Sequence, residues 1–378
     1  MSRAQVFPLI MAGGASSRLW PASDRRKPKW ALRLFGGFSL LEQAWRRART
    51  VAPASHCFVA AGVAQAALVR RSLPELPARN LLVEPEPRDT AGAIALAAAA
   101  ISALGRRDAG GTGRKPVMLV LPGDHIIEPL SRFRECAATG ARVAVELGAL
   151  VTFGILPRKA ATAYGYVHRG VEIALRGASR SAPRAYKVLG FREKPDQRTA
   201  DHYLASGVYY WNGGIFLWTL DALLAEFERQ LPGHADFVRT LGAAPLRGRK
   251  WDSLLRARFT ALRKISIDFG VMEHAALVAT VAADFDWDDI GSWSAVAEHL
   301  DRSTGNAVGP ATDTLAVGAH GNIVFASGKR VALVGVEGLA VVASDNDILV
   351  CRLDRDQDVR KVSAAVAART AASRPRRR

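Results

Sequence analysis

The sequence predicts an α/β protein in which helices flank a mainly parallel sheet, followed by a small all-β domain. Up to about residue 155, short apolar runs rich in β-branched residues alternate with longer stretches of helical periodicity. Such alternation is typical of parallel strands joined by crossover helices. After residue 303, short strands separated by Gly or Asp turns follow one another at about ten-residue spacing, which indicates a β-sandwich or a stub of β-helix.

Five apolar runs in the first region have the composition of strands that are covered on both faces of a sheet. They span residues 6–11, 57–61, 81–83, 117–121 and 150–154. Their order, with helical stretches between them, predicts a Rossmann-like architecture.

Helix starts can be placed between these strands. Ser39 and Glu42 have the spacing of a capping box, which predicts a helix that continues to about Arg49. Asp89 or Thr90 can cap the Ala-rich helix that follows, and residues 132–147 form a third candidate helix. Loops are expected at 105–115 and 176–184, the second joining two strands.

The C-terminal part has a different pattern. Strands are expected at 323–325, 331–336, 339–343 and 348–352, with a helix at 359–368. We therefore predict a large α/β domain over 1–300, a small β domain that ends in a helix over 301–368, and a basic disordered tail over 369–378.

Length and composition bound the classes of protein that this chain can be. Its 378 residues suffice for about two domains. With 49% hydrophobic and 23% charged residues, it is not collagen-like, wholly disordered or a disulfide scaffold. The net charge of +17 suits nucleic acid, an anionic surface or a phosphate-rich substrate. Basic and aromatic residues are not interleaved in one segment, so binding to nucleic acid is disfavoured.

Cysteine usage and hydropathy indicate where the protein resides. Cys57, Cys136 and Cys351 are odd in number and far apart, which favours a reducing cytoplasm. No apolar stretch reaches the 18 or so residues that a membrane span needs, so membrane insertion is not expected.

The most informative segment begins where the first expected strand ends. Gly13 and Gly14 follow Met11 and Ala12, so backbone N–H groups there can approach an anion, and Arg18 and Lys29 bring positive charge. The loop is therefore expected to hold a nucleoside triphosphate. It is neither a P-loop nor a dinucleotide fingerprint.

The run from Met11 to Pro21 resembles the signature of the sugar-1-phosphate nucleotidyltransferase family, and its Arg-Leu-Trp-Pro form is most similar to the mannose-1-phosphate guanylyltransferases. Further blocks resemble this family in the same order; they lie at 84–91, 121–125, 152–155, 164–166, 191–195, 211–216, 266–273 and 287–293. The resemblance implies a nucleotidyltransferase-type fold. The chain ends without the cupin-like isomerase domain of longer members, so phosphomannose isomerase activity is not expected.

The resemblance implies an enzyme that joins GTP to mannose 1-phosphate, giving GDP-mannose for polysaccharide biosynthesis and releasing pyrophosphate. Direct attack of the sugar phosphate on the α-phosphorus needs no side-chain nucleophile, but it needs charge neutralisation and a divalent ion such as Mg²⁺. Asp124, at the carboxyl end of an expected strand, is the first candidate ligand. By resemblance Asp289 is the second, with Asp288 as a solvated neighbour.

The remaining site residues are also carried over by resemblance. Arg18, Lys29 and Lys194 are expected to act in catalysis. The expected nucleotide-binding residues are Ala12, Gly13, Gly14, Ser17, Arg18, Lys29, Glu84, Arg88, Thr90, Gly123 and Asp124. Those expected to bind the sugar phosphate are Gly165, Glu193, Lys194 and Asn212. The tryptophans at 20, 211, 218, 287 and 293 are interpreted as core anchors rather than stacking platforms.

Several positions depart from the family pattern and keep alternatives open. Ser16 stands where Gly is usual, and its Cβ would cost about 1 to 2 kcal/mol if the loop needs a positive φ. Asp89 replaces Asn, Ser17 replaces Thr and Gly123 replaces Ser. The same chemistry with another nucleotide, or another sugar phosphate such as a manno-heptose, is the second hypothesis, and a non-catalytic paralogue is the third. Oligomeric state is left open, with a homodimer as the candidate.

Overall fold

The computed structural model describes residues 4–14, 17–24, 26–105 and 114–372. Ser16, most of the loop expected at 105–115 and the end of the basic tail lie outside the described residues. The chain forms two compact units. Unit 1 comprises Met1–Gly13, Ala44–Gly123 and Ile127–Trp287, and unit 2 comprises Gly14–Gln43, Asp124–Ile126 and Asp288–Arg378. The domain boundary near residue 300 stays a prediction.

Unit 1 is built on a nine-stranded sheet with the order β3-β2-β1-β4-β9-β6-β10-β8-β7. Its strands are β1 (Ala4–Met11), β2 (Phe58–Gly62), β3 (Leu81–Glu84), β4 (Lys115–Pro122), β6 (Leu150–Ile155), β7 (Tyr166–Glu172), β8 (Ala185–Arg192), β9 (Tyr209–Thr219) and β10 (Val278–Ala283). The five strands expected from apolar runs correspond to β1, β2, β3, β4 and β6. The α/β fold class is therefore confirmed.

The sheet is mixed rather than mainly parallel. β3, β2, β1 and β4 are parallel neighbours, as expected, and β6 is parallel to β10. However, β9 runs antiparallel to both β4 and β6. β7 and β8 are antiparallel because the connection between them, at 173–184, contains no crossover helix. The expectation that the loop near 176–184 joins two strands is confirmed.

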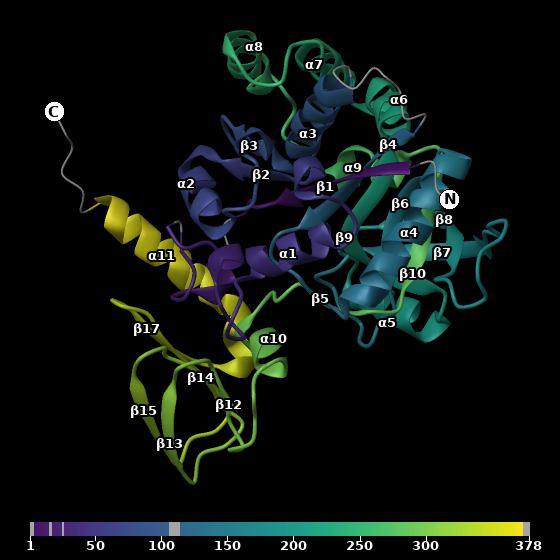
Figure 1. The fold of residues 1–378 in the computed structure, drawn as a ribbon. Coiled ribbons are helices and arrows are strands. Elements are labelled where there is room, and N and C mark those ends of the chain that lie inside the picture. Colours follow the sequence, from purple (N-terminus) through teal and green to yellow (C-terminus); the bar gives the residue numbers. More distant parts are fainter. Residues whose placement is uncertain (1–3, 15–16, 25, 106–113, 373–378) are drawn as a thin grey trace. The chain divides into compact units, whose positions relative to one another are not determined.

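Helices cover both faces of this sheet (Figure 1). They are α2 (Val63–Ser72), α3 (Asp89–Gly105), α4 (Leu130–Leu147), α5 (Gln197–Ser206), α6 (Leu220–Gln230), α7 (Pro232–Gly242), α8 (Arg249–Phe259) and α9 (Ile267–Gly270). Side chains alternate along β9: Phe216 and Trp218 belong to the cluster around α3. Leu217, on the other face, lies against α4 at Gly140.

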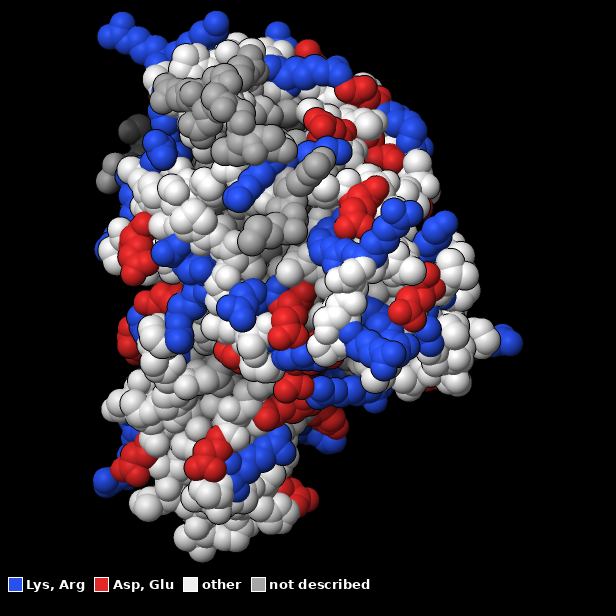
Figure 2. Space-filling view, turned by 45° about the vertical axis from the view of Figure 1, so that its right-hand side comes forward, with Lys and Arg blue, Asp and Glu red and all other residues white. Residues whose placement is uncertain are grey.

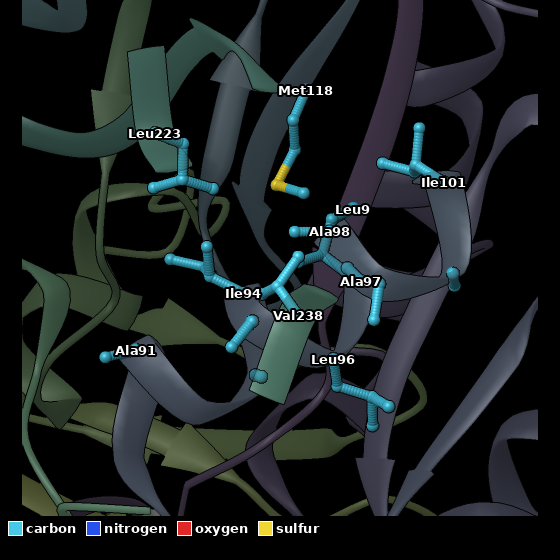
Figure 3. Packing of buried hydrophobic residues seen from close by; sticks show 14 of the residues in the cluster. Leu9, Ala91, Ile94, Leu96, Ala97, Ala98, Ile101, Met118, Leu223 and Val238 are labelled. Carbon is cyan, nitrogen blue, oxygen red and sulfur yellow. The ribbon is translucent and has the colours of Figure 1, made fainter. Parts of the chain in front are cut away.

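The main core of unit 1 surrounds the Ala-rich helix α3. Figure 3 shows Ile94, Ala98 and Ile101 of α3 with Leu9 of β1 and Met118 of β4, and also side chains from α6 and α7. Most of α3 is buried because the sheet covers one side and α7 another. The small alanine side chains allow this close approach.

Unit 2 contains a β-helix stub and two helices, α10 (Trp293–Glu298) and α11 (Val359–Ala372). Its strands are β12 (Ala307–Val308), β13 (Asp313–Val317), β14 (Ile323–Phe325), β15 (Arg330–Val334), β16 (Leu339–Ala343) and β17 (Ile348–Arg352). β12, β14 and β16 are parallel, as are β13 and β15. Asn322 Nδ2 donates to Asn306 Oδ1 at 2.9 Å, one coil earlier. The β-helix alternative is therefore confirmed.

The core of unit 2 brings together parts of the chain that are far apart in sequence. The signature loop is the glycine-containing start of the signature run, at 11–14, and Leu19 and Trp20 lie further along that run. Both share one apolar cluster with Trp293 and Val359. The indole N–H of Trp293 donates to the Trp20 carbonyl at 3.2 Å. The 3-10 turn Ser17–Leu19 contacts α11. The segment that carries Arg18 thus rests on the β-helix part of its own unit.

Three further elements complete the description. Helix α1 (Leu40–Arg49) begins with the predicted capping box: Ser39 N–H donates to Glu42 Oε2 at 2.6 Å, and Glu42 N–H donates to Ser39 Oγ at 3.2 Å. The strands β5 (Ile126–Glu128) and β11 (Asp286–Asp288) pair with each other. No helix in the described ranges combines the length and the apolarity that crossing a membrane would require.

Candidate functional site

The signature loop leaves β1 with its backbone accessible. Ala12 is buried and donates its N–H to the Ala60 carbonyl at 2.8 Å, which fixes the end of the strand. Gly13 and Gly14 are exposed, and no atom lies within 4 Å of the place where a Cβ of either would stand. Gly14 has φ +96°, a conformation that side chains other than Gly disfavour. The loop therefore presents open space to a ligand.

Gly123, at the end of β4, is required by the backbone beside it. Its N–H donates to the Met11 carbonyl at 3.1 Å. A Cβ at this position would lie 2.8 Å from the same carbonyl oxygen. The departure from the Ser that is usual in the family thus has a packing reason.

Lys29, in unit 2, joins two of the predicted acidic positions. Its side chain is 8% exposed, and Nζ lies 2.8 Å from Oδ2 of Asp124. The same Nζ donates to the main-chain carbonyl of Asp289. Burial pulls the pKa of Asp124 upward, but the charges of Lys29 and His125 outweigh burial and hold this pKa below its ordinary value. Asp124 is therefore ionised at neutral pH.

The turn that carries Asp289 has an unusual backbone. Ile290 is fully buried and has φ +46°, which is rare for a β-branched residue. Asp288 stabilises the turn by accepting the Ile290 N–H at 2.7 Å, and its other oxygen lies 2.9 Å from His299 Nε2. The expectation that Asp288 is a solvated neighbour is wrong, because its side chain is only 14% exposed and supports this turn.

Arg18 and Asp289 converge above Gly291. A Cβ on Gly291 would lie 3.2 Å from Arg18 Nη1 and 3.2 Å from Asp289 Oδ1. Gly291 thus provides the space in which this cation and this acid approach each other. Unit 2 brings together Arg18, Lys29, Asp124 and Asp289, all of which the sequence analysis singled out.

The acids of this group suit a hard divalent cation in number and type. Within the described ranges, no three His, Cys, Asp or Glu side chains are grouped so that they could hold a metal ion. A cation held by the carboxylates of Asp124 and Asp289 would therefore need further oxygen ligands from outside the described side chains. Mg²⁺ commonly binds to one or two carboxylates plus substrate phosphates and water.

In unit 1, a second polar group follows β8. Lys194 has φ +48°, a strained conformation for a residue with a side chain, and its Nζ lies 3.2 Å from Glu193 Oε1. Glu193 Oε2 is buried, and no described group donates to it. A Cβ on Gly165 would overlap this oxygen. A residue larger than glycine at position 165 would therefore displace the Glu193 carboxylate.

Asn212 is held by three partners in the same part of unit 1. Its Oδ1 accepts from Thr152 Oγ1 at 2.8 Å and from the Gly214 N–H at 3.3 Å. Its Nδ2 donates to Asp268 Oδ1 at 3.0 Å. A Cβ on Gly165 would also lie 3.4 Å from Asn212 Cβ, so Gly165, Glu193 and Asn212 are neighbours.

Asp268 is a hydrogen-bond partner of Asn212 that the sequence analysis did not single out. Burial raises the pKa of its carboxyl to about 7, and the nearby charge of Glu193 adds to the rise. It lies in the first turn of α9 after the N-cap residue Ser266, where an acid has an ordinary structural explanation. Asp268 lies in the block at 266–273 that resembles the family, and this position is the only feature of the sequence that could have drawn attention to it.

Three residues expected to border the nucleotide make structural contacts in unit 1. Burial raises the pKa of Glu84 to about 7, with a contribution from Asp89. Arg88 donates to the Glu86 carboxylate and to the Thr260 carbonyl. Thr90 Oγ1 accepts the Ile267 N–H at 2.7 Å, which ties the start of α3 to α9.

The tryptophans behave as the expected core anchors. Trp20, Trp211, Trp218 and Trp293 are buried. Trp287 is partly buried and donates to the Gly213 carbonyl at 3.1 Å.

The surface charge is mixed: on the face drawn in Figure 2, acidic side chains are interspersed among the basic ones.

Two family models match consecutive parts of this chain. The nucleotidyl transferase family model matches residues 7–304, and a MannoseP isomerase/GMP-like beta-helix domain model matches residues 313–364. Xanthan biosynthesis protein XanB of Xanthomonas campestris pv. campestris is 36% identical over 373 residues, which cover 96% of this chain and 73% of the relative. Mannose-1-phosphate guanylyltransferase of Klebsiella pneumoniae is 36% identical over 359 residues, which cover 94% of this chain and 73% of the relative.

A solved structure is similar over almost the whole chain. It is described as mannose-1-phosphate geranyltransferase from Thermus thermophilus and has a TM-score of 0.82 at 34% identity. The similarity covers 96% of this chain and 99% of that one. It therefore includes the β-helix part as well as the large sheet.

Proposed function

Because the chain belongs to the nucleotidyl transferase family, we propose that it transfers GMP from GTP to mannose 1-phosphate, giving GDP-mannose and pyrophosphate. The names of its relatives support this choice of substrates. The observation that carries the proposal is the group in unit 2: Lys29 donates to both Asp124 and Asp289, and Arg18 approaches Asp289 over Gly291. Such a group suits chemistry between phosphate esters.

The reaction needs little covalent help from the protein. An anionic oxygen of the sugar phosphate attacks the α-phosphorus of GTP, and the bond from this phosphorus to the β-phosphate oxygen breaks, so pyrophosphate leaves. Both reactants are anions, and positioning with charge neutralisation therefore provides most of the catalysis. Arg18 and Lys29 are proposed to hold the phosphates of GTP.

The loop and strand-end residues are proposed to bind the rest of the nucleotide. Backbone groups of the signature loop would approach the triphosphate, because glycines leave it uncovered. The proposed nucleotide-binding residues are Ala12, Gly13, Gly14, Ser17, Glu84, Arg88, Thr90, Gly123 and Asp124. A divalent cation such as Mg²⁺, held by Asp124 and Asp289, would supply positive charge to phosphate oxygens.

The polar group of unit 1 is proposed to bind the sugar phosphate. Lys194 would contact the phosphate, and its side chain is 61% exposed and available for this role. Glu193 and Asn212 would contact sugar hydroxyls, with the backbone of Gly165 beside them.

We further propose a cytoplasmic location and a homodimer. The free cysteines Cys57, Cys136 and Cys351 suit a reducing compartment.

A pyrophosphate-release assay tests this proposal. Mannose 1-phosphate is offered with GTP, ATP, UTP, CTP and dTTP in turn, and a manno-heptose phosphate is offered with the preferred nucleotide. We expect release with GTP and mannose 1-phosphate. A preference for another base or sugar would replace the proposed substrates, and no release with any pair would favour a non-catalytic paralogue.

A further inference from the structure

Asp268 is fixed in place by a chain of hydrogen bonds. The short helix α9 starts at Ile267, whose N–H donates to Thr90 at the start of α3. The Asp268 carboxylate then accepts from Asn212, and Asn212 is oriented by Thr152 on the neighbouring strand β6. This arrangement fixes the carboxylate before any ligand arrives, and preorganisation of this kind favours binding.

Glu193 is a second carboxylate in the same group. The charge of Glu193 raises the pKa of the Asp268 carboxyl, so the two carboxylates interact. Gly165 lies beside both Glu193 and Asn212. Two acids held near each other repel, and each loses hydration by burial. Glu193 Oε2 is also buried without a donor among the described residues, although such an oxygen ordinarily finds a partner. The folded protein thus keeps one buried acceptor in this group, Glu193 Oε2, that no described residue satisfies.

A sugar can supply the missing donors. A phosphate would be repelled by two carboxylates, whereas hydroxyl groups donate hydrogen bonds to them without adding negative charge. Lys194 Nζ lies 3.2 Å from Glu193 Oε1, and its charge also acts on Asp268, so one cation stands next to the two acids. A ligand that carries both a phosphate and neighbouring hydroxyls matches this combination of one cation and two acceptors.

We propose that Asp268 is a further substrate-binding residue, which together with Glu193 accepts hydrogen bonds from two neighbouring hydroxyls of a hexose 1-phosphate. The assignment rests on the proposed function. It makes Asp268 a determinant of sugar specificity, because a site built to accept from a hydroxyl strongly rejects an analogue that lacks the hydroxyl.

A purely structural role for Asp268 gives a different expectation. If the carboxylate only orients Asn212, removing it impairs all sugars alike. If it binds a hydroxyl, its removal costs nothing further for the sugar that lacks this hydroxyl. The two roles are therefore separated by pairing each variant with each deoxy sugar, as in a double-mutant cycle.

The experiment compares Asp268→Asn and Glu193→Gln with the full-length wild-type protein. kcat/KM is measured with mannose 1-phosphate and its 2-deoxy and 3-deoxy analogues at saturating GTP. Asp236→Asn is the matched control, because it also removes one negative charge but lies on the exposed side of α7. Melting curves establish that each variant is folded.

We expect the wild type to discriminate against at least one deoxy analogue by about 100-fold or more. In Asp268→Asn this discrimination should fall to less than about tenfold, with KM for GTP unchanged within about twofold. Unaltered discrimination in Asp268→Asn, or an equal rise in KM for GTP, would overturn the proposal.

Failure of the proposed function gives a distinct result. In that case the wild type releases no pyrophosphate with mannose 1-phosphate and GTP. Direct calorimetric titration of wild type and Asp268→Asn with mannose 1-phosphate and glucose 1-phosphate then tests the assignment by itself. Weaker binding of only one of the two sugar phosphates to the variant supports it, whereas an equal loss for both, which a purely structural role predicts, or equal affinities of the two proteins, including no binding to either, reject it.

Discussion

Nζ of Lys29 lies 2.8 Å from Oδ2 of Asp124 in a largely buried ion pair. Removing one partner of such a pair leaves the other as an uncompensated charge, which is costly. The same ammonium also donates to the Asp289 carbonyl. Lys29 thus helps to hold both proposed cation ligands, Asp124 and Asp289, in place.

Asp124→Asn should abolish most turnover and, because it leaves the buried charge of Lys29 uncompensated, should also lower the free energy of unfolding, so activity is compared under conditions in which melting curves show the variant to be folded. The amide keeps the shape of the carboxylate but loses the charge that a divalent cation needs, and we expect kcat to fall by at least about 100-fold. Asp345→Asn, on an exposed turn of the same unit, is the control and should retain full activity. Wild-type turnover of Asp124→Asn at saturating Mg²⁺ would remove Asp124 from the cation site.

Lys194→Ala should affect the sugar phosphate rather than the nucleotide. A hydrogen bond to a charged group contributes about 1.5 to 3 kcal/mol, so KM for mannose 1-phosphate should rise by roughly tenfold to 100-fold. KM for GTP should stay near its wild-type value. Lys187→Ala, exposed on β8, controls for loss of positive charge. Equal losses for both substrates would contradict the role assigned to Lys194.

Leu19→Ala should destabilise the protein and lower its activity. Leu19 is 1% exposed and lies in the core of unit 2, directly after Arg18. Loss of a buried leucine side chain costs about 2 to 5 kcal/mol. Leu315→Ala, at a position that is 56% exposed, should change the free energy of unfolding by less than about 0.5 kcal/mol. Chemical denaturation measures both, and similar effects would show that the β-helix part does not support the signature segment.

The sequence predicts the strands, the capping box and the β-helix stub because these depend on local patterns. The capping box at Ser39 and Glu42 is confirmed atom by atom. The direction of β9 was not predictable in this way, because an apolar run such as 215–218 has the same composition in a parallel or an antiparallel strand. Direction depends on which strands become neighbours.

In the candidate site, too, some residues could be predicted from local sequence patterns, whereas others depend on the tertiary structure. The glycine loop pointed to Arg18 and Lys29, the end of an expected strand to Asp124, and the resemblance to Asp289. The structure brings these four residues together in unit 2. Asp288 was misjudged, because its two hydrogen bonds depend on the turn at Ile290 and on distant His299. The roles of Arg18, Lys29, Asp124 and Asp289 in binding and catalysis stay predictions.

Gly165→Ala should impair use of the sugar phosphate. A Cβ there would overlap Glu193 Oε2, so Glu193 must move away from the position that we assign to a sugar hydroxyl. Overpacking costs about 1 to 3 kcal/mol, which corresponds to a rise in KM for mannose 1-phosphate of roughly fivefold to 100-fold. Gly233→Ala is a matched control, since nothing lies within 4 Å of its Cβ position. An unchanged KM in Gly165→Ala would argue against Glu193 as a sugar ligand.

Stability should depend on pH through Asp268. Burial, with help from Glu193, raises the pKa of its carboxyl from 3.8 to about 7. Between these values the folded protein binds more protons than the unfolded chain, so this group makes stability fall as pH rises. Burial also lowers the pKa of His234 from 6.5 to about 4, and this group makes stability rise with pH across that lower window.

The comparison of Asp268→Asn with wild type isolates the contribution of Asp268, because His234 is present in both proteins. Melting temperatures are measured at about pH 5 and about pH 8. We expect the change from the lower to the higher pH to be more favourable in the variant, since it lacks an acid that must ionise at a buried position. Parallel curves for the two proteins would show that Asp268 titrates near its ordinary value, and the electrostatic link to Glu193 would then be lost.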